Sequence, residues 1–131
     1  MAKGGGDQKR VKRFAERVRQ EIAELVLHGR LHEPDADGVL ISRVMVTPDL
    51  RVARVFVRHE DPEITEFRKK KLLVALGRAK GFLRRELADR LDMKHAPEME
   101  FRWDVGLDHA MGIEALLDEI ERDAKKQKGN P

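Results

Sequence analysis

The sequence predicts an α+β domain in which helices cover one face of a small sheet. Two observations support this fold class. Some segments carry apolar residues at helical spacing, whereas others alternate apolar and polar side chains as strands do. These segments follow one another as helix, strand, strand, helix, helix, strand, helix, which differs from the regular alternation of a parallel α/β fold. With 131 residues, the chain is expected to form one domain.

A first helix is predicted over residues 10–28. Its apolar positions have helical spacing: Val11, Phe14, Val18, Ile22 and Leu25. Gly29 follows as a helix stop. Residues 1–9 are rich in glycine and are expected to be a flexible N-terminus. The domain is therefore predicted to span residues 10–120, with a basic, frayed tail over residues 121–131.

Two strands are predicted next, over residues 39–47 and 50–58. Pro48-Asp49 between them indicates a tight turn and an antiparallel hairpin. We expect one face of this hairpin to point into the core through Leu40, Val44, Val46, Ala53, Val55 and Val57. The opposite face would then carry Arg43, Arg54, Phe56 and Arg58.

The second half of the chain is predicted to contain two helices, a strand and a closing helix. Asp61-Pro62 is expected to open the next helix, with Pro62 in its first turn. Its apolar stripe, which resumes after Gly81, comprises Phe67, Leu72, Leu73, Leu76, Phe82, Leu83, Leu87 and Leu91. Residues 97–104 alternate as a strand, with Met99, Phe101 and Trp103 facing inward. The closing helix has the stripe Ile113, Leu116, Leu117 and Ile120.

The net charge of +3 is distributed unevenly along the chain. Residues 1–30 carry +4 and residues 68–94 carry +7, whereas residues 31–67 and 95–131 each carry −4. Such a polarised surface fits an anionic partner. Cysteine is absent, which excludes disulfides and thiolate metal sites. Because the sequence contains no membrane-length apolar run and its start does not resemble a secretory signal, we expect a soluble cytoplasmic protein.

Gly81 lies in the middle of a strongly basic helical segment, residues 76–91. A glycine inside a helix costs about 1 kcal/mol relative to alanine. Two explanations are open at this stage. The glycine allows a neighbouring element to pack closely, or it marks a bend at Ala79-Lys80-Gly81. In the second case Lys80, Arg84 and Arg85 would surround the free N–H groups of a helix start, which favour phosphate.

This junction is similar to the Ala-X-Gly interrupted helix of the ribosome-binding factor A family. Other segments resemble the same family, namely "RVKRFAERVRQEIAELV" (10–26), "VTPDLRVARVFV" (46–57) and "PEMEFRWDVGLDHAMGIEALL" (97–117). The resemblance implies a KH-like fold of type II topology, α-β-β-α-α-β, with Ala-X-Gly in place of the GXXG loop and with an additional C-terminal helix.

The same resemblance implies a non-enzymatic assembly factor that binds the free 30S subunit during late maturation. Its expected target is 16S rRNA near the 5′-end helix and the decoding region, and its expected roles are in rRNA processing and growth in the cold. A monomer without a cofactor is expected. Two other functions stay open: a general KH-like RNA-binding protein, and a protein-interaction module that docks on an acidic partner.

The candidate RNA-binding residues fall into two groups. Lys12, Arg13 and Arg17 come from the first helix, whereas Ala79, Lys80, Gly81, Arg84 and Arg85 form or surround the junction. Cations of this kind contact phosphate and fix position rather than base identity. The run Lys69–Lys71 is a weaker candidate, because consecutive residues wrap around a helix and do not face one partner.

No catalytic residue and no metal site are predicted. His28 and His32 have the i, i+4 spacing of a metal-binding pair, but no third ligand is evident and Gly29 is expected to break the helix between them. The segment "EPDADG" does not complete a calcium loop, and the sequence has no Walker-type glycine loop. The sequence therefore favours a binding protein over an enzyme.

Overall fold

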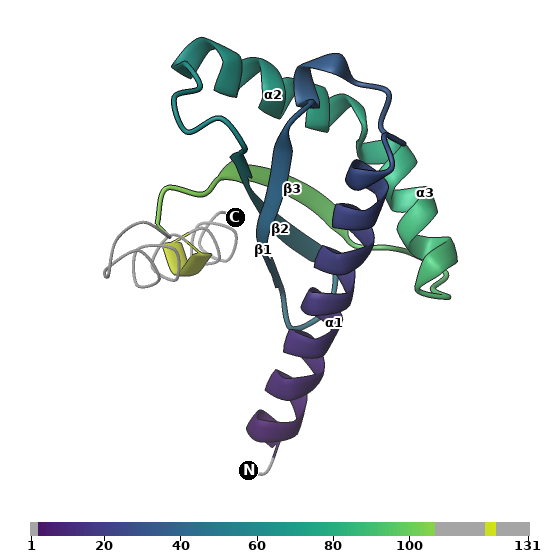
Figure 1. The fold of residues 1–131 in the computed structure, drawn as a ribbon. Coiled ribbons are helices and arrows are strands. Elements are labelled where there is room, and N and C mark those ends of the chain that lie inside the picture. The colour runs from purple at the N-terminus through teal and green to yellow at the C-terminus, as the bar shows by residue number, and fades with distance from the viewer. Residues whose placement is uncertain (1–2, 107–119, 123–131) are drawn as a thin grey trace, which may run out of the picture.

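The computed structural model describes residues 3–106 and 120–122. The chain forms α1 (Lys3–Leu27), a short 3-10 helix η1 (Pro34–Ala36), β1 (Val39–Val46), β2 (Val52–His59), α2 (Glu66–Arg78), α3 (Lys80–Arg90) and β3 (Glu98–Trp103). This order confirms the predicted α+β class (Figure 1). The predicted closing helix lies mainly outside the described residues, which resume with a helical turn at 120–122.

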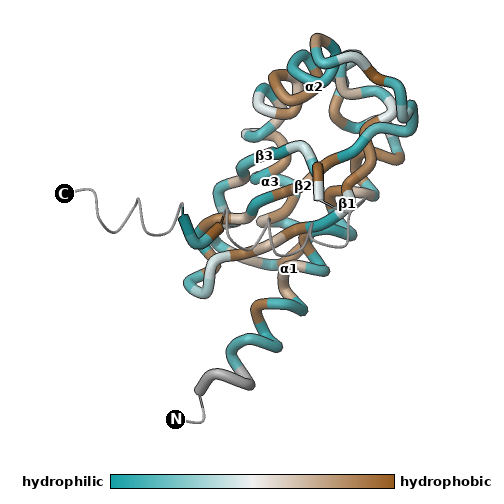
Figure 2. The backbone as a smooth tube through the Cα atoms, turned by 90° about the vertical axis from the view of Figure 1, so that its left-hand side faces the viewer, coloured by the Kyte–Doolittle hydropathy of each residue, from teal (hydrophilic) through white to brown (hydrophobic). Residues whose placement is uncertain are grey.

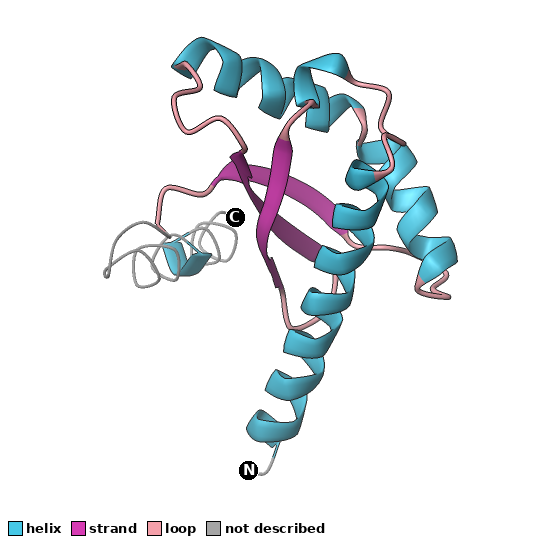
Figure 3. Ribbon diagram, in the orientation of Figure 1, coloured by secondary structure: helices cyan, strands magenta, loops and turns pink. Residues whose placement is uncertain are grey.

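The three strands form one sheet in the order β1-β2-β3, in which β1 is antiparallel to β2 and β2 is parallel to β3. Figure 3 shows the strands in one layer beside the helices. A parallel pair needs a long crossover connection, and here α2 and α3 together supply it. The junction between these two helices therefore lies halfway along the connection from β2 to β3.

One core lies between the sheet and the three helices. Val18, Ile22 and Leu25 of α1 have no exposed surface, and neither do Val55 and Val57 of β2. The crossover adds the fully buried leucines Leu72, Leu76, Leu83 and Leu87. These residues confirm the apolar stripes that helical spacing predicted. Phe101 and Trp103 of β3 are half-buried and pack against the same core.

The first helix is longer than predicted at its start and ends where predicted. It begins at Lys3 rather than at residue 10, and Figure 2 shows that the N-terminal end of α1 projects beyond the sheet. At its other end Gly29 has a φ of +67°, while Arg30 N–H donates to the Leu25 carbonyl at 3.0 Å. This pattern is a Schellman motif, in which glycine takes the left-handed conformation at low cost.

The core face predicted for β1 was wrong at Leu40, whose surface is 49% exposed. The ladder pairs Ile41 with Val57 but Arg43 with Phe56, so Ser42 forms a β-bulge. An extra residue reverses the alternation of faces, and Ile41 is buried before the bulge where Val44 is buried after it. Counting back from Val44 in steps of two therefore assigns Leu40 to the core face, although Ile41 is the buried residue.

Ser42 also joins the bulge to the end of β3. Its hydroxyl lies 2.6 Å from Oδ2 of Asp104, a side chain that is only 2% exposed. The Asp104 carboxylate also accepts a hydrogen bond from Gly106 N–H, and the Asp104 N–H donates to the Val57 carbonyl. The bulge is thus connected to all three strands.

The predicted start of α2 was also wrong. The helix begins at Glu66 and not at Pro62, because the Thr65 hydroxyl accepts a hydrogen bond from Arg68 N–H at 3.2 Å and caps the helix. Residues 61–63 instead form a turn in which the Asp61 carboxylate accepts from Glu63 N–H. Phe67, expected in the apolar stripe, is 69% exposed, since it lies in the first turn of the helix.

Candidate nucleic-acid interface

The structure places all six predicted cations on the surface and Ala79 in the core. Lys12, Arg13 and Arg17 are exposed on the N-terminal half of α1, and Lys80, Arg84 and Arg85 are exposed on the first turns of α3. Gly81 is also exposed, whereas Ala79 is 5% exposed and packs in the core. Ala79 therefore positions the junction and cannot itself contact a partner extensively.

These six cations form no ion pair with any described residue, in contrast to several other basic side chains. Arg78 contacts Glu33 at 2.8 Å and Arg90 contacts Glu21 at 2.9 Å. The hydrogen bond to Glu33 raises the pKa of Arg78, and the bonds to Glu21 and then Glu24 raise the pKa of Arg90. The positive charge of Arg78 and Arg90 is thus used within the protein, whereas no described carboxylate neutralises the six predicted cations, of which Arg84 donates a hydrogen bond to the Ala96 carbonyl at 3.2 Å.

The two groups of cations are not brought together. Arg90, at the end of α3, pairs with Glu21 and Glu24 of α1, while Arg30 just after α1 contacts Glu86 and lies over the Phe82 ring. The two helices therefore run antiparallel. From Arg17 to the end of α1 is ten residues, or about 15 Å, so an acidic, internally paired region separates the groups.

The residues of the first group also diverge around α1. Lys12 lines a groove between α1 and β1 together with Arg43. Arg13 lines a different recess with Phe14, and the β1–β2 turn closes that recess through Leu50. Lys12 and Arg13 are adjacent in sequence and so point about 100° apart around a helix of 3.6 residues per turn. A single flat partner therefore cannot cover the whole first group.

The junction is an interruption of one residue. Ala79 follows α2 and precedes α3 with a φ of −84° and a ψ of −2°, and its N–H lies 3.1 Å from the Leu76 carbonyl and 3.2 Å from the Ala75 carbonyl. The first N–H groups of α3 have no acceptor within that helix by their position. They begin at Lys80 and Gly81, next to the cations of Lys80 and Arg85, which form no ion pair with a described residue.

Gly81 is not required by the packing of this chain. A Cβ at this position would meet only Nη1 of Arg85, at 3.5 Å, which is an ordinary contact with the end of a flexible side chain. Of the two explanations from the sequence, close packing of a neighbouring described element is therefore wrong. A side chain at residue 81 would instead cover the exposed backbone beside Lys80 and Arg85.

The weaker candidates are partly engaged within the protein. Lys69 lies 4.8 Å from the centre of the Trp103 ring and 3.2 Å from Glu66, and Lys71 lies 3.9 Å from Asp35. Lys70 is exposed without such a contact among the described residues. The run therefore divides between internal contacts and solvent, as the wrapping argument indicated.

Sequence reasoning missed Arg43 as a candidate functional residue. Its side chain is half-buried in β1, and no described acidic residue pairs with it. A half-buried guanidinium without a counterion is uncommon, because burial costs more when the charge is not compensated. The sequence could predict only that Arg43 lies on one face of a strand. Whether an acidic side chain pairs with it depends on tertiary structure.

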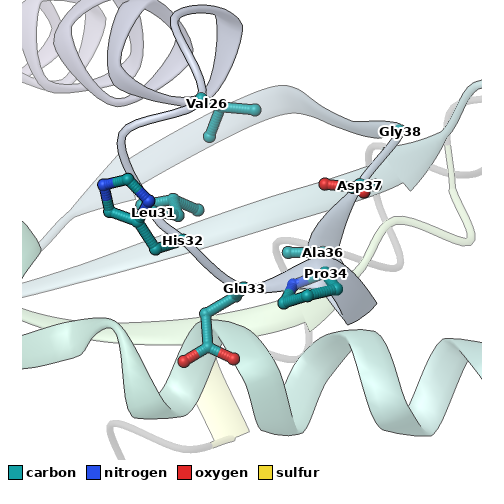
Figure 4. A pocket seen from close by; sticks show the side chains of 9 residues that line it. Val26, Leu31, His32, Glu33, Pro34, Ala36, Asp37 and Gly38 are labelled. Atoms are coloured by element: carbon teal, nitrogen blue, oxygen red, sulfur yellow. The ribbon is translucent and has the colours of Figure 1, made fainter.

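The described residues do not assemble a catalytic or metal site. No group of three or more His, Asp or Glu side chains among them could hold a metal ion, and His28 lies beyond the end of α1. The recess in Figure 4, of about 380 Å³, is lined by His32, Asp37 and apolar neighbours, while Glu33 points toward α2, where it pairs with Arg78. No helix in the described part of the chain is long and apolar enough to cross a membrane.

Fold and surface together define a small KH-like binding domain, with an interrupted helix and exposed cations that no described carboxylate neutralises. The chain belongs to the ribosome-binding factor A family, whose sequence model matches residues 10–117. That family is named for binding the ribosome and not for a reaction, in agreement with the prediction that the chain is not an enzyme.

Individual relatives extend this similarity over most of the chain. Ribosome-binding factor A of Bradyrhizobium sp. (strain BTAi1) is 39% identical over 115 residues, which cover 86% of this chain and 80% of that protein. The protein of the same name from Sorangium cellulosum is 40% identical over 116 residues, covering 88% and 92%.

Solved structures carry the same fold. The crystal structure of ribosome-binding factor A from Thermus thermophilus superposes with a TM-score of 0.60 at 25% identity, over 71% of this chain and 93% of that one. A homology model of the Thermus thermophilus factor, fitted into a cryo-EM map of its complex with the 30S subunit, has a TM-score of 0.53 at 26% identity, over 66% and 87%.

Proposed function

We propose that this protein is a non-enzymatic assembly factor that binds the free 30S subunit through its 16S rRNA during late maturation. The observation that carries the proposal is the junction of α2 and α3. There, an exposed glycine backbone lies among exposed cations that no described residue neutralises, in a chain of this family. The Thermus thermophilus relative fitted into a 30S complex supports the same partner for this chain.

Binding at the junction would be mainly electrostatic. Lys80 and Arg85 supply phosphate contacts, whose free energy comes from the release of counterions condensed on RNA. The N–H groups at the start of α3 point in the direction that favours an anion. Because Gly81 has no side chain, a sugar-phosphate backbone can approach these groups more closely than an alanine would allow.

Arg13 and Arg17 would form a second contact with the same subunit. Since about 15 Å of α1 follows Arg17 and about 21 Å follows Arg13 before the helix ends, the two sites fit two phosphate-bearing segments of a folded RNA better than one short strand. We place the target near the 5′-end helix and the decoding region of 16S rRNA, with a role in rRNA processing and growth in the cold. The protein would act as a cytoplasmic monomer.

The first test is co-sedimentation of the full chain with purified 30S subunits, 50S subunits and total RNA, at low and moderate salt. Selective, saturable binding to free 30S subunits is expected. The double variant Lys80→Gln, Arg85→Gln should bind more weakly. The matched variant Arg68→Gln, at an exposed arginine of α2 that pairs with no described residue, should bind like the wild type.

Other outcomes would contradict this proposal in distinct ways. Equal binding to every RNA, or tight binding to short unstructured oligonucleotides, would identify a general KH-like RNA-binding protein. Absence of binding to any RNA would leave the protein-interaction module as the function.

A further inference from the structure

We propose that the outer edge of β1, with the groove between β1 and α1, binds an extended acidic segment of a partner protein as an additional strand. This inference does not rest on the proposed ribosomal function. The groove has a volume of about 710 Å³ and lies between one face of α1, from Asp7 to Arg19, and β1 from Ser42 to Val46. It is separate from the junction of α2 and α3.

The backbone of β1 presents unpaired groups to this groove. Among the described strands β1 pairs only with β2, so its other side is a free edge. The Thr47 N–H donates to the Val52 carbonyl of β2 at 2.9 Å. Because the direction alternates along an antiparallel strand, the N–H and C=O groups of Val46 and Val44 point away from β2. Both residues line the groove.

The charges in the groove fit an acidic partner. Arg19 is already neutralised by Glu16, at 2.6 Å, and the exposed Asp7 is the other acidic residue of the lining, so its three cations outnumber its two carboxylates. Arg43 is half-buried and Lys12 is exposed, and neither forms an ion pair or a hydrogen bond with a described residue. Lys12 lies on the α1 wall of the groove, whereas Arg43 belongs to the face of β1 opposite Val44, so a strand laid along the edge would meet the two cations on its two faces. A carboxylate in a strand laid along the edge would neutralise charges that the described residues leave uncompensated.

The same groove does not suit RNA bases. Single-stranded RNA is usually held by aromatic side chains on which bases stack, and none of the described residues that line the groove is aromatic. Val11, Ala15 and Met45 instead supply small apolar surfaces, which suit the alternate side chains of a peptide strand. Main-chain hydrogen bonds would give affinity, and the cations would select acidic sequences.

The length of the edge sets the size of the partner segment. The five residues Ser42–Val46 extend about 17 Å at about 3.3 Å per residue, which matches a strand of four or five residues. The bulge at Ser42 interrupts the regular edge, so the pairing is expected to extend from Val46 toward Arg43 and to stop there.

The test uses the full chain labelled with ¹⁵N and a capped octapeptide that alternates valine and glutamate. Saturable shifts of the Val44 and Val46 amide signals are expected. An octapeptide of valine and lysine should bind more weakly, since it places ammonium groups beside Arg43 or, in the other register, beside Lys12. Arg43→Glu should raise the Kd for the valine–glutamate peptide about tenfold, whereas Arg68→Glu, the same charge reversal at an exposed arginine of α2 outside the groove, should not change it.

A second variant tests the backbone pairing without removing a charge. Val46→Pro removes an N–H that points away from β2 and leaves the hydrogen bonds between β1 and β2 in place, as proline does at an edge position. The variant should therefore bind the peptide more weakly, while its Trp103 emission stays like that of the wild type. Binding that is absent, or equal for both peptides, would overturn the proposal. The proposal would also be overturned if octauridylate shifted the Val44 and Val46 amide signals and the peptide did not. Broadening of the Val44 and Val46 signals by a spin label at Asp118→Cys would show that this chain covers its own edge, which would also overturn it.

Discussion

At the scale of single residues, two glycines of the crossover test whether an open backbone serves a partner. Gly77 and Gly81 both lie in helices, and an added Cβ would meet nothing within 4 Å at Gly77 and only Arg85 at Gly81. We therefore expect Gly77→Ala and Gly81→Ala each to raise the free energy of unfolding by about 0.5–1 kcal/mol, measured by urea denaturation.

Binding should separate these two variants. Gly81→Ala places a methyl group beside Lys80 and Arg85, so its binding to 30S subunits should decrease, whereas Gly77→Ala should bind like the wild type. Equal binding by both variants would mean that Gly81 is only a weak point of the helix and has no part in recognition.

Two loop glycines should behave in the opposite way. Gly29 and Gly38 have φ values of +67° and +84°, which are unfavourable for residues with a side chain. A Cβ at Gly38 would also lie 2.6 Å from Nε2 of His59, which contacts the Asp37 carbonyl at 2.9 Å. Gly29→Ala should cost about 1–2 kcal/mol of unfolding free energy and Gly38→Ala distinctly more. Similar urea midpoints for the two would contradict this account of Gly38.

At the scale of elements, the β1–β2 turn links the stability of the hairpin to pH. The Thr47 hydroxyl, and then the Arg51 N–H, donate hydrogen bonds to Asp49 and hold its pKa below 3.8. A lowered pKa in the folded state means that the charged form stabilises the fold. That contribution is present above the pKa of the unfolded chain and is lost as the pH falls through the folded value.

Asp49→Asn keeps an oxygen acceptor in the turn but cannot titrate. The urea midpoint of the variant should therefore decrease less than that of the wild type as the pH falls from about 4 to about 2. Thr47→Val removes the largest cause of the lowered pKa and should flatten the same part of the profile. Parallel profiles for all three proteins would show that the turn contributes nothing to acid sensitivity.

Elements also show how far the sequence alone could predict the fold. The order of helices and strands and the buried stripes of α1 and α3 follow from spacing that a single helix or strand imposes. Leu40 was misplaced because a bulge, which adds one residue to a strand, leaves no mark in the alternation of side chains. Pro62 was a weaker helix start than Thr65, whose hydroxyl caps the first turn.

The candidate site was predictable residue by residue but not as an arrangement. Exposed cations on two helices could be recognised from composition and spacing. Arg90 and Arg78 are neutralised by acidic residues far away in the sequence, whereas no described acidic residue neutralises Lys80 or Arg85, and local spacing does not encode this difference. The separation of Arg17 from the junction depends on the antiparallel packing of α1 and α3, which no local pattern encodes.

At the scale of the whole molecule, affinity for RNA should depend strongly on salt. Each phosphate contact contributes a slope of about −0.7 to −0.9 in a plot of log K against log salt concentration. The double variant Lys80→Gln, Arg85→Gln should reduce the magnitude of the slope for 30S binding by about 1.4–1.8. Titrations at several potassium concentrations measure it. An unchanged slope would show that neither side chain contacts a phosphate.

The parallel pairing of β2 with β3 has a consequence for the order of folding. The hairpin of β1 and β2 closes over a short turn, whereas β3 can join only after the whole segment from Glu60 to Pro97 has returned to the sheet. Closing a longer loop costs more chain entropy, so β3 should be the last strand to pair. The single tryptophan, Trp103, lies on that strand beneath Lys69. A stopped-flow experiment that follows its emission therefore times the final step of folding, after the hairpin has formed.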